Sequence, residues 1–236
     1  MRLVAVGLAL LVVSPPAAAC PAPHLVDVPL IADGATLLDD GGVVIETRSA
    51  RGGGDEAMGL QLTSGGAKLG ATRDFIASGL WVLRPPRGDG RTIEVVDGAS
   101  TVRWTLTQAK GTGPHAAPKA TRMTSSLGRE RATKRAVKMH RGVAASVAEL
   151  TLAEAPPDDV LAVVVFRITK DGSHGIAWWP RNEAELVYGY STGGKGCVPG
   201  PSPVHLGEKV AIGFIDLHGR TSPLSRPLVV TAVKKR

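Results

Sequence analysis

The sequence predicts an all-β protein whose mature part folds into two antiparallel β-sandwich domains. Short runs of strand-forming residues recur along the chain, such as Val43-Val44-Ile45 and Val163-Val164-Val165-Phe166. Residue pairs that favour tight turns separate these runs: Asp33-Gly34, Asp40-Gly41-Gly42, Asp89-Gly90, Asp97-Gly98, Asp171-Gly172 and His218-Gly219. Hydrophobic residues make up 43% of the 236 residues. That share is sufficient for packed cores, and the length suits two domains of common size better than one.

The first 19 residues have the layout of a secretory signal peptide. Met1-Arg2 supplies positive charge, residues 3–13 are an uncharged apolar run, and Ala17-Ala18-Ala19 places small residues before a cleavage point at Cys20. The run is shorter than the about 20 apolar residues that a membrane-spanning helix needs. We therefore expect a protein exported to the periplasm, the extracellular medium or the outer surface, with no membrane span.

Cys20 and Cys197 are the two cysteines of the chain. In an oxidising compartment an even cysteine count favours a disulfide, so we predict a Cys20–Cys197 bond. A cysteine directly after the cleavage point is also where bacterial lipoproteins carry their lipid, and lipid anchoring at Cys20 is the alternative. Lipoprotein signals usually have a larger aliphatic residue at the position of Ala17, which favours ordinary cleavage and an unlipidated Cys20.

The first domain is expected to span residues 20–109. Ala35-Thr36-Leu37-Leu38 and Val43-Val44-Ile45 flank a tight turn and predict a β-hairpin. Residues 92–96 and 101–106 are rich in β-branched side chains and predict two further strands joined by a tight turn. A domain built from such short strands is typical of a sandwich or barrel.

The second domain, residues 143–236, carries a more specific pattern near its end. Alternating apolar residues are followed by an aspartate, a glycine turn and a last apolar run: Val210, Ile212, Phe214, Asp216, Gly219 and Leu228-Val229-Val230. Residues 208–225 thereby resemble the end of a fibronectin type III or related bacterial immunoglobulin-like domain. The resemblance implies that the three alternating side chains point into a sandwich core and that the last run is the final strand. It implies no particular function, because such folds host many.

Residues 110–142 carry most of the positive charge of the chain. They hold nine Lys or Arg residues against one acid, Glu130, a net charge of +8 where the whole chain carries +7. The segment is interpreted as a basic linker or first strand of the second domain. Alternatively it is a patch for a polyanion such as an acidic envelope glycan. The candidate polyanion-binding residues are Arg129, Arg131, Lys134, Arg135, Lys138 and Arg141.

Apolar residues between positions 132 and 150 also fall at helical spacing, so a basic amphipathic helix is a second interpretation of this region. We prefer strands, because residues 147–152 lead directly into the second sandwich.

Trp178, Trp179, Tyr188 and Tyr190 form a candidate glycan-stacking surface. Successive side chains on a strand alternate between its faces, so the two tryptophans cannot both point into a core. An outward tryptophan beside the tyrosines, which share one face, would stack on a sugar ring. The alternative is one core tryptophan and one half-buried neighbour.

The sequence shows no pattern typical of an enzyme, a metal site or a cofactor site. The six histidines lack paired ligand spacing, and the chain has no nucleophile elbow or phosphate-binding loop. We expect an exported, non-enzymatic structural or protein-interaction module, with a carbohydrate- or polyanion-binding protein as the alternative. The expected partner is a protein or an envelope glycan rather than nucleic acid, and the oligomeric state is left open.

Overall fold

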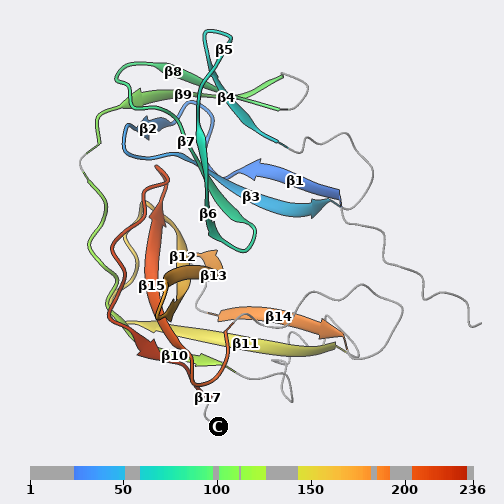
Figure 1. Ribbon diagram of the computed structural model, residues 1–236, viewed down its shortest axis with the longest axis vertical. Helices are drawn as coiled ribbons and strands as arrows, with labels where there is room; N and C mark the ends of the chain where they lie inside the picture. Colours follow the sequence, from blue (N-terminus) through green and yellow to red (C-terminus); the bar gives the residue numbers. More distant parts are fainter. Residues whose placement is uncertain are drawn as a thin grey trace, which may run out of the picture.

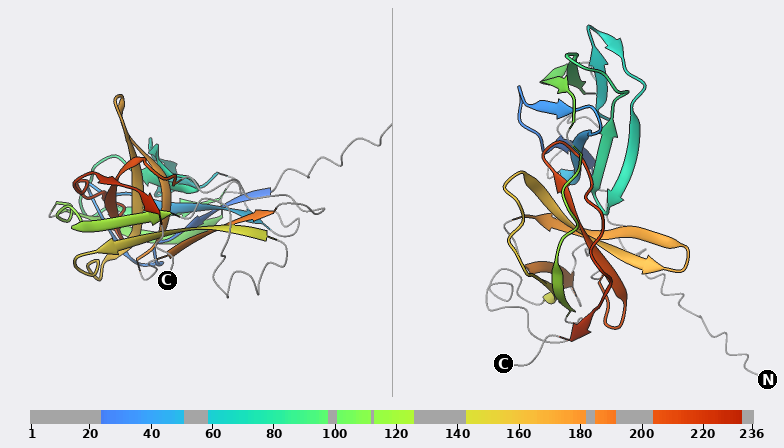
Figure 2. Two further views of the ribbon diagram at one scale, coloured as in Figure 1. Left: turned by 90° about the horizontal axis from the view of Figure 1, so that it is seen from below. Right: turned by 90° about the vertical axis from the view of Figure 1, so that its left-hand side faces the viewer.

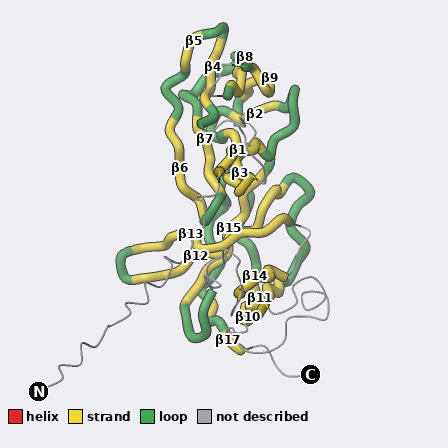
Figure 3. Tube along the Cα trace, turned by 90° about the vertical axis from the view of Figure 1, so that its right-hand side faces the viewer, coloured by secondary structure: helices red, strands yellow, loops and turns green. Residues whose placement is uncertain are grey.

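The computed structural model describes residues 24–50, 59–97, 101–111, 113–125, 143–181, 185–191 and 204–232. Every regular element in these ranges is a β-strand, as Figure 3 shows, which confirms the all-β prediction. The strands form four sheets that stack in pairs as two sandwiches (Figure 1). The predicted signal peptide, residues 1–19, lies outside the described residues.

The first sandwich has an immunoglobulin-like division of its strands between two sheets. Its strands are β1 (His24–Pro29), β2 (Thr36–Leu38), β3 (Val43–Ala50), β4 (Gln61–Ser64), β5 (Ala67–Lys68), β6 (Thr72–Ala77), β7 (Leu80–Arg84), β8 (Thr92–Val96) and β9 (Val102–Ala109). One sheet has the order β1-β3-β7-β6 and the other the order β2-β9-β8-β4-β5. The first order corresponds to the ABED sheet of immunoglobulin domains, and β9-β8-β4 corresponds to their GFC strands.

The core of the first sandwich lies between these two sheets. Val43 and Ile45 of β3 are fully buried in it, and so is Leu37 of β2. The predicted hairpin between β2 and β3 is wrong, because β2 pairs in parallel with β9 whereas β3 pairs with β1 and β7 in the opposite sheet. Residues 39–42 therefore carry the chain across from one sheet to the other. The predicted hairpin of residues 92–96 with 101–106 is confirmed as β8 and β9.

The second sandwich is fibronectin type III-like, as the resemblance implied. Its strands are β10 (Ala120–Ser125), β11 (Val143–Leu152), β12 (Val160–Thr169), β13 (Gly172–Pro180), β14 (Glu185–Ser191), β15 (Lys209–Asp216), β16 (Leu228–Val229) and β17 (Thr231–Ala232). One sheet has the order β14-β11-β10-β17 and the other the order β13-β12-β15-β16. The last apolar run is not the final strand as a whole: Leu228 and Val229 form β16, which pairs with β15. The chain ends its described part in β17, residues 231–232, which pairs in parallel with β10 of the other sheet.

β15 shows the alternation that the sequence predicted. Val210, Ile212 and Phe214 are buried in the core of the second sandwich, and Lys209 at the start of the strand is exposed. After the turn that follows β15, the chain runs back beside this strand and brings Ser222 and Ser225 next to it. The backbone N–H of Phe214 donates to Ser222 Oγ and that of Ile212 to Ser225 Oγ, each at 2.9 Å. Serine side chains thereby take the place of strand carbonyls along this irregular return.

The basic segment 110–142 is divided between three parts of the fold. Residues 110–119 connect β9 to β10, β10 is the first strand of the second sandwich, and residues 126–142 join β10 to its antiparallel neighbour β11. The candidate residues in the last part lie outside the described residues: Arg129, Arg131, Lys134, Arg135, Lys138 and Arg141. Residues 143–152 form strand β11, as preferred over the helix for this part of the region, whereas residues 132–142 lie outside the described residues.

Candidate functional site

The two sandwiches meet through a shared apolar cluster, which we call the junction. On β12, Val163 and Val165 point into the core of the second sandwich, whereas Ala162 and Val164 point outward into the junction. From the first sandwich the junction receives buried side chains of β3, β6 and β7: Val44, Ile76, Ala77, Leu80 and Val82. The sheet that contains β12 therefore buries apolar side chains on both of its faces, one in the core and one in the junction.

The adjacent tryptophans of β13 are divided between these two apolar regions. Trp179 is 1% exposed and packs in the core of the second sandwich. Trp178 packs against the junction, and its indole N–H donates to the carbonyl of Ser78 in the first sandwich at 3.1 Å. Trp179 is therefore the core tryptophan and Trp178 its half-buried neighbour, which is the alternative given above, and the buried ring of Trp179 is not accessible to a glycan. Trp178 instead has a place in the contact between the sandwiches.

Close backbone approach at the junction requires a glycine on β13. A Cβ atom at Gly175 would overlap the carbonyl group of Ile76 on β6. The second half of β6 thus lies directly against β13, and any side chain at position 175 would push the two sandwiches apart. Figure 3 shows this end of β6 reaching down to β13.

A buried ion pair shapes the turn between β15 and the final strands. Asp216 is 0% exposed and Arg220 is 7% exposed, and Arg220 Nε donates to Asp216 Oδ2 at 2.7 Å. The other oxygen, Asp216 Oδ1, accepts the backbone N–H groups of His218 and Arg220 at 2.9 Å each. Every oxygen of this buried carboxylate therefore has a partner, which is the condition under which a buried charge is tolerated.

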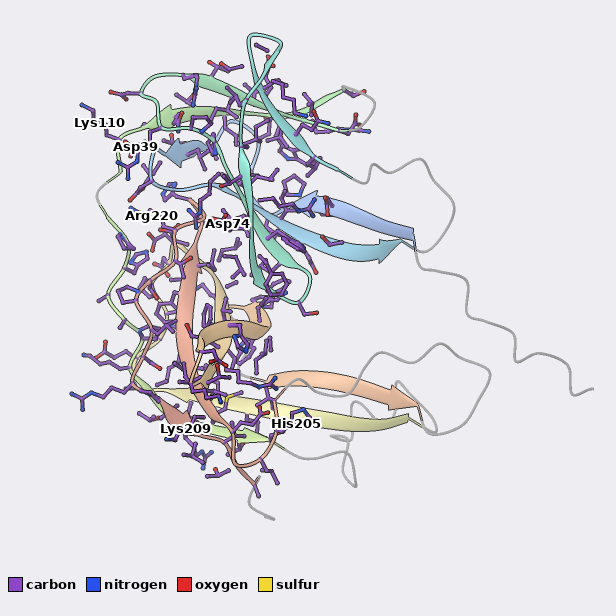
Figure 4. The ribbon with its side chains drawn as sticks, viewed as in Figure 1. Asp39, Asp74, Lys110, His205, Lys209 and Arg220 are labelled. Carbon is purple, nitrogen blue, oxygen red and sulfur yellow. The ribbon has the colours of Figure 1, made fainter. Side chains whose placement is uncertain are left out.

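This turn bonds directly to the first sandwich. The N–H of Gly42 donates to the carbonyl of His218 at 2.7 Å, and His218 Nδ1 donates to the carbonyl of Thr36 at 2.8 Å. Gly219 has φ +72° and lies so close to Gly42 that a Cβ atom there would overlap the Gly42 carbonyl. Figure 4 places Arg220 at the end of β15 that faces the first sandwich, below Asp39.

The connector between the sandwiches is fixed to both of them. The N–H of Gly111 donates to Asp39 Oδ1 at 2.8 Å, and Arg220 Nη1 donates to the carbonyl of Gly113 at 2.5 Å. His115 Nε2 lies 2.9 Å from Asp159 Oδ2 of the second sandwich. The connector, the turn after β15 and the apolar cluster of the junction thus all link the first sandwich to the second.

The described lysines of the basic segment have acidic neighbours. Lys119 Nζ lies 2.7 Å from Glu154 Oε1, and this hydrogen bond, together with the attraction of the Glu154 charge, raises the pKa of Lys119. Lys110 Nζ lies 4.0 Å from Asp89 Oδ2. Of the described cations in the segment, Lys119 and Lys110 thus lie near acids, whereas Arg122 on β10 is exposed.

Two other predicted sites fall partly or wholly outside the described residues. Tyr188 and Tyr190 lie on β14, opposite Ser146 and Ala144 of β11, but their side chains are not among those described. Cys20 and Cys197 are outside the described residues altogether, so their disulfide stays a prediction.

An exposed cluster on the first sandwich was not predicted from the sequence. Phe75 of the edge strand β6 is 52% exposed, and its ring meets Trp81 of β7 edge-to-face with centroids 5.0 Å apart. The guanidinium of Arg73 lies 4.7 Å above the Trp81 ring and bonds to Asp27. Thr47 Oγ1 also donates to Asp27, at 2.6 Å. The signal that could have found it is the alternation of Arg73 and Phe75, which puts both on one face of β6.

Among the described residues, no group of three His, Cys, Asp or Glu side chains is arranged to hold a metal ion, and no helix is long and apolar enough to cross a membrane. No family model matches the chain, and no curated protein matches it.

Solved structures give matches at low similarity. The FN1–FN3 domains of chicken CNTN1 match at a TM-score of 0.33 and 7% identity, over 90% of this chain and 66% of that one. The fibronectin(III)-like modules of Clostridium thermocellum CbhA match at a TM-score of 0.25 and 7% identity, over 89% of this chain and 94% of that one. The chain thus spans just under two thirds of the length of the CNTN1 structure.

Proposed function

We propose that the protein is an exported, non-enzymatic structural or protein-interaction module of the bacterial envelope or extracellular space, in which the two sandwiches act as one rigid body. The observation that supports this role is the junction. It combines buried apolar side chains from both domains with hydrogen bonds from the turn after β15.

Domains in one chain usually move relative to each other unless their interface is large and hydrophobic. Here β12 contributes alternate residues to the second core and to the junction, so parting the sandwiches exposes one whole face of a central strand. A rigid pair of sandwiches holds surfaces of both domains at a fixed spacing. That property suits a spacer or a docking platform.

The test of rigidity compares mature protein, residues 20–236, with the variant Val164→Asp, which places a charge in the junction. Because a buried unpaired charge is strongly unfavourable, the sandwiches should separate. Small-angle scattering should show a longer particle, and calorimetry should show two unfolding transitions instead of one. Ser173→Asp on the exposed part of β13 is the matched control, and Trp178→Ala is a milder junction variant. Unchanged scattering and one transition in both junction variants would contradict the proposal.

The export part of the proposal has its own test. The full chain is expressed with its own leader in a bacterial host, and the exported protein is examined by intact-mass spectrometry. We expect a polypeptide that begins at Cys20 and carries no lipid, because Ala17 is smaller than the residue lipoprotein signals prefer. A mass increased by a diacylglycerol and an acyl chain would contradict this.

The second candidate function is binding of a carbohydrate or polyanion, and the exposed aromatic and cationic side chains of β6 favour it. Binding of an acidic glycan through the basic segment should weaken as salt rises, because exposed charges are screened beyond about 8 Å at physiological ionic strength. Neutralising Arg131, Lys134, Arg135 and Lys138 together should then abolish binding without unfolding the protein.

A further inference from the structure

The cluster of Arg73, Phe75, Trp81, Asp27 and Thr47, here the Phe75 cluster, lies on the face of its sheet that forms the core elsewhere. Phe75 pairs with Trp81, which pairs with Ile45, a core residue of β3. Because paired residues share a face, Phe75 is the outermost member of a row that begins in the core. β6 is the edge strand of this sheet, and the row ends there in an aromatic ring that is 52% exposed.

The exposed ring is one end of a series of side-chain contacts. Phe75 rests against Trp81, and the guanidinium of Arg73 lies over the Trp81 ring. Arg73 Nη2 is in turn held 3.1 Å from both oxygens of Asp27, whose side chain is only 5% exposed. Thr47 completes the chain of contacts by donating to Asp27. These contacts restrict the side chains of the cluster, and side chains that are ordered before binding lose less entropy when a ligand binds.

We propose that the Phe75 cluster is a binding site for a pyranose ring of a glycan. The apolar C–H face of the sugar lies on the Phe75 ring, and sugar oxygens accept hydrogen bonds from Arg73. Among the described residues, Arg73 bonds to Asp27 through Nη2, so Nε and Nη1 of its donor fork are available to these oxygens. This inference rests on the interaction role proposed above and names the ligand class.

The charge balance of the cluster distinguishes this site from the basic segment. Asp27 compensates the charge of Arg73, so the cluster as a whole is neutral and suits an uncharged sugar. Binding here should therefore depend little on salt, in contrast to binding through residues 126–142. A docking site for an apolar peptide would also use Phe75, but it would need only apolar area and not an aromatic face.

The experiment titrates mature protein with cellotetraose, chitotetraose and tetragalacturonate at about 50 and 500 mM salt, following tryptophan emission and calorimetric heat. At least one neutral probe is expected to bind with an affinity that salt changes by less than about twofold. The emission change should vanish in Trp81→Phe and persist in Trp104→Phe, because Trp81 lies in the cluster.

Substitutions of Phe75 and Arg73 decide between the occupants. Phe75→Leu, which keeps an apolar side chain without a ring, and Arg73→Gln should each weaken binding at least about tenfold, while Phe75→Tyr retains it. Val229→Ala, an exposed site on the second sandwich, is the matched control. Full affinity in Phe75→Leu, loss of binding only when the basic segment is neutralised, or no binding of any probe would each overturn the proposal. None of these outcomes alters the junction measurements, so the two proposals fail separately.

Discussion

At the scale of single residues, Asp216 stabilises the turn after β15, which bonds to the first sandwich. Its two oxygens accept three hydrogen bonds, one of them from the buried guanidinium of Arg220. Without the carboxylate, Arg220 would remain buried in the turn after β15 with its charge uncompensated. The cost of breaking a buried pair from one side is about 3–5 kcal/mol.

We therefore expect Asp216→Ala to lower the free energy of unfolding by about 3–5 kcal/mol in urea denaturation. The double variant Asp216→Ala with Arg220→Met should recover part of this loss, because it removes both charges. Exposed Arg226→Met is the control. If the single and double variants were equally destabilised, the pair would not be the source of the effect.

At the scale of the element, β15 is the strand whose inward-pointing side chains the sequence predicts best. Phe214 lies in the core, and its backbone N–H bonds to Ser222. Replacing Phe214 with alanine removes a buried ring and leaves a cavity, so unfolding should become easier by about 3–5 kcal/mol. Lys209→Ala, at the exposed start of the same strand, should change the free energy by no more than about 0.5 kcal/mol. A loss below about 1 kcal/mol for Phe214→Ala would contradict the burial of this strand.

Strand positions were predictable because alternation and turn residues are local signals, whereas strand partners depend on the whole fold. Residues 92–96 and 101–106 pair as expected. β2, however, pairs with β9 and not with its sequence neighbour β3, and in this position Leu37 enters the core from the sheet opposite β3. The junction left one trace in the sequence, the continuous apolar run 160–166 of β12. Such a run is typical of a strand buried on both faces, yet it does not say what covers the second face.

The candidate sites on the surface were likewise predictable only where the signal is local. The rule of alternating faces predicted that Trp178 and Trp179 point in opposite directions, and it left open which of them is accessible. The structure assigns Trp179 to a core and Trp178 to the junction. The Phe75 cluster joins residues from four strands, and no short stretch of sequence contains that arrangement.

At the scale of the whole molecule, the predicted disulfide would tie the mature N-terminus to the second sandwich. β1 begins and β14 ends on the same side of the molecule, as Figures 1 and 2 show. Cys20 precedes β1 by four residues and Cys197 follows β14 by six. Extended chains of these lengths span about 14 and 22 Å at most.

We expect non-reducing peptide mapping of exported protein to give one peptide pair joining Cys20 and Cys197. Closing so long a loop reduces the entropy of the unfolded chain, so reduction should lower stability by up to about 5 kcal/mol. The Cys20→Ser, Cys197→Ser variant should match the reduced protein. Two free thiols in exported protein would contradict the bond.

The parallel pairs at the ends of each sandwich have a mechanical consequence. In the first sandwich β2, near the entry of the chain, runs parallel to β9 at its exit, and in the second β10 runs parallel to β17. When the chain is pulled by its two ends, such neighbours slide along each other, so their hydrogen bonds carry the load together and do not open one after another. If the junction also holds the two sandwiches together as proposed, the protein should extend little before one of these strand pairs breaks. Stretching a single molecule should give abrupt rupture at high force rather than gradual extension.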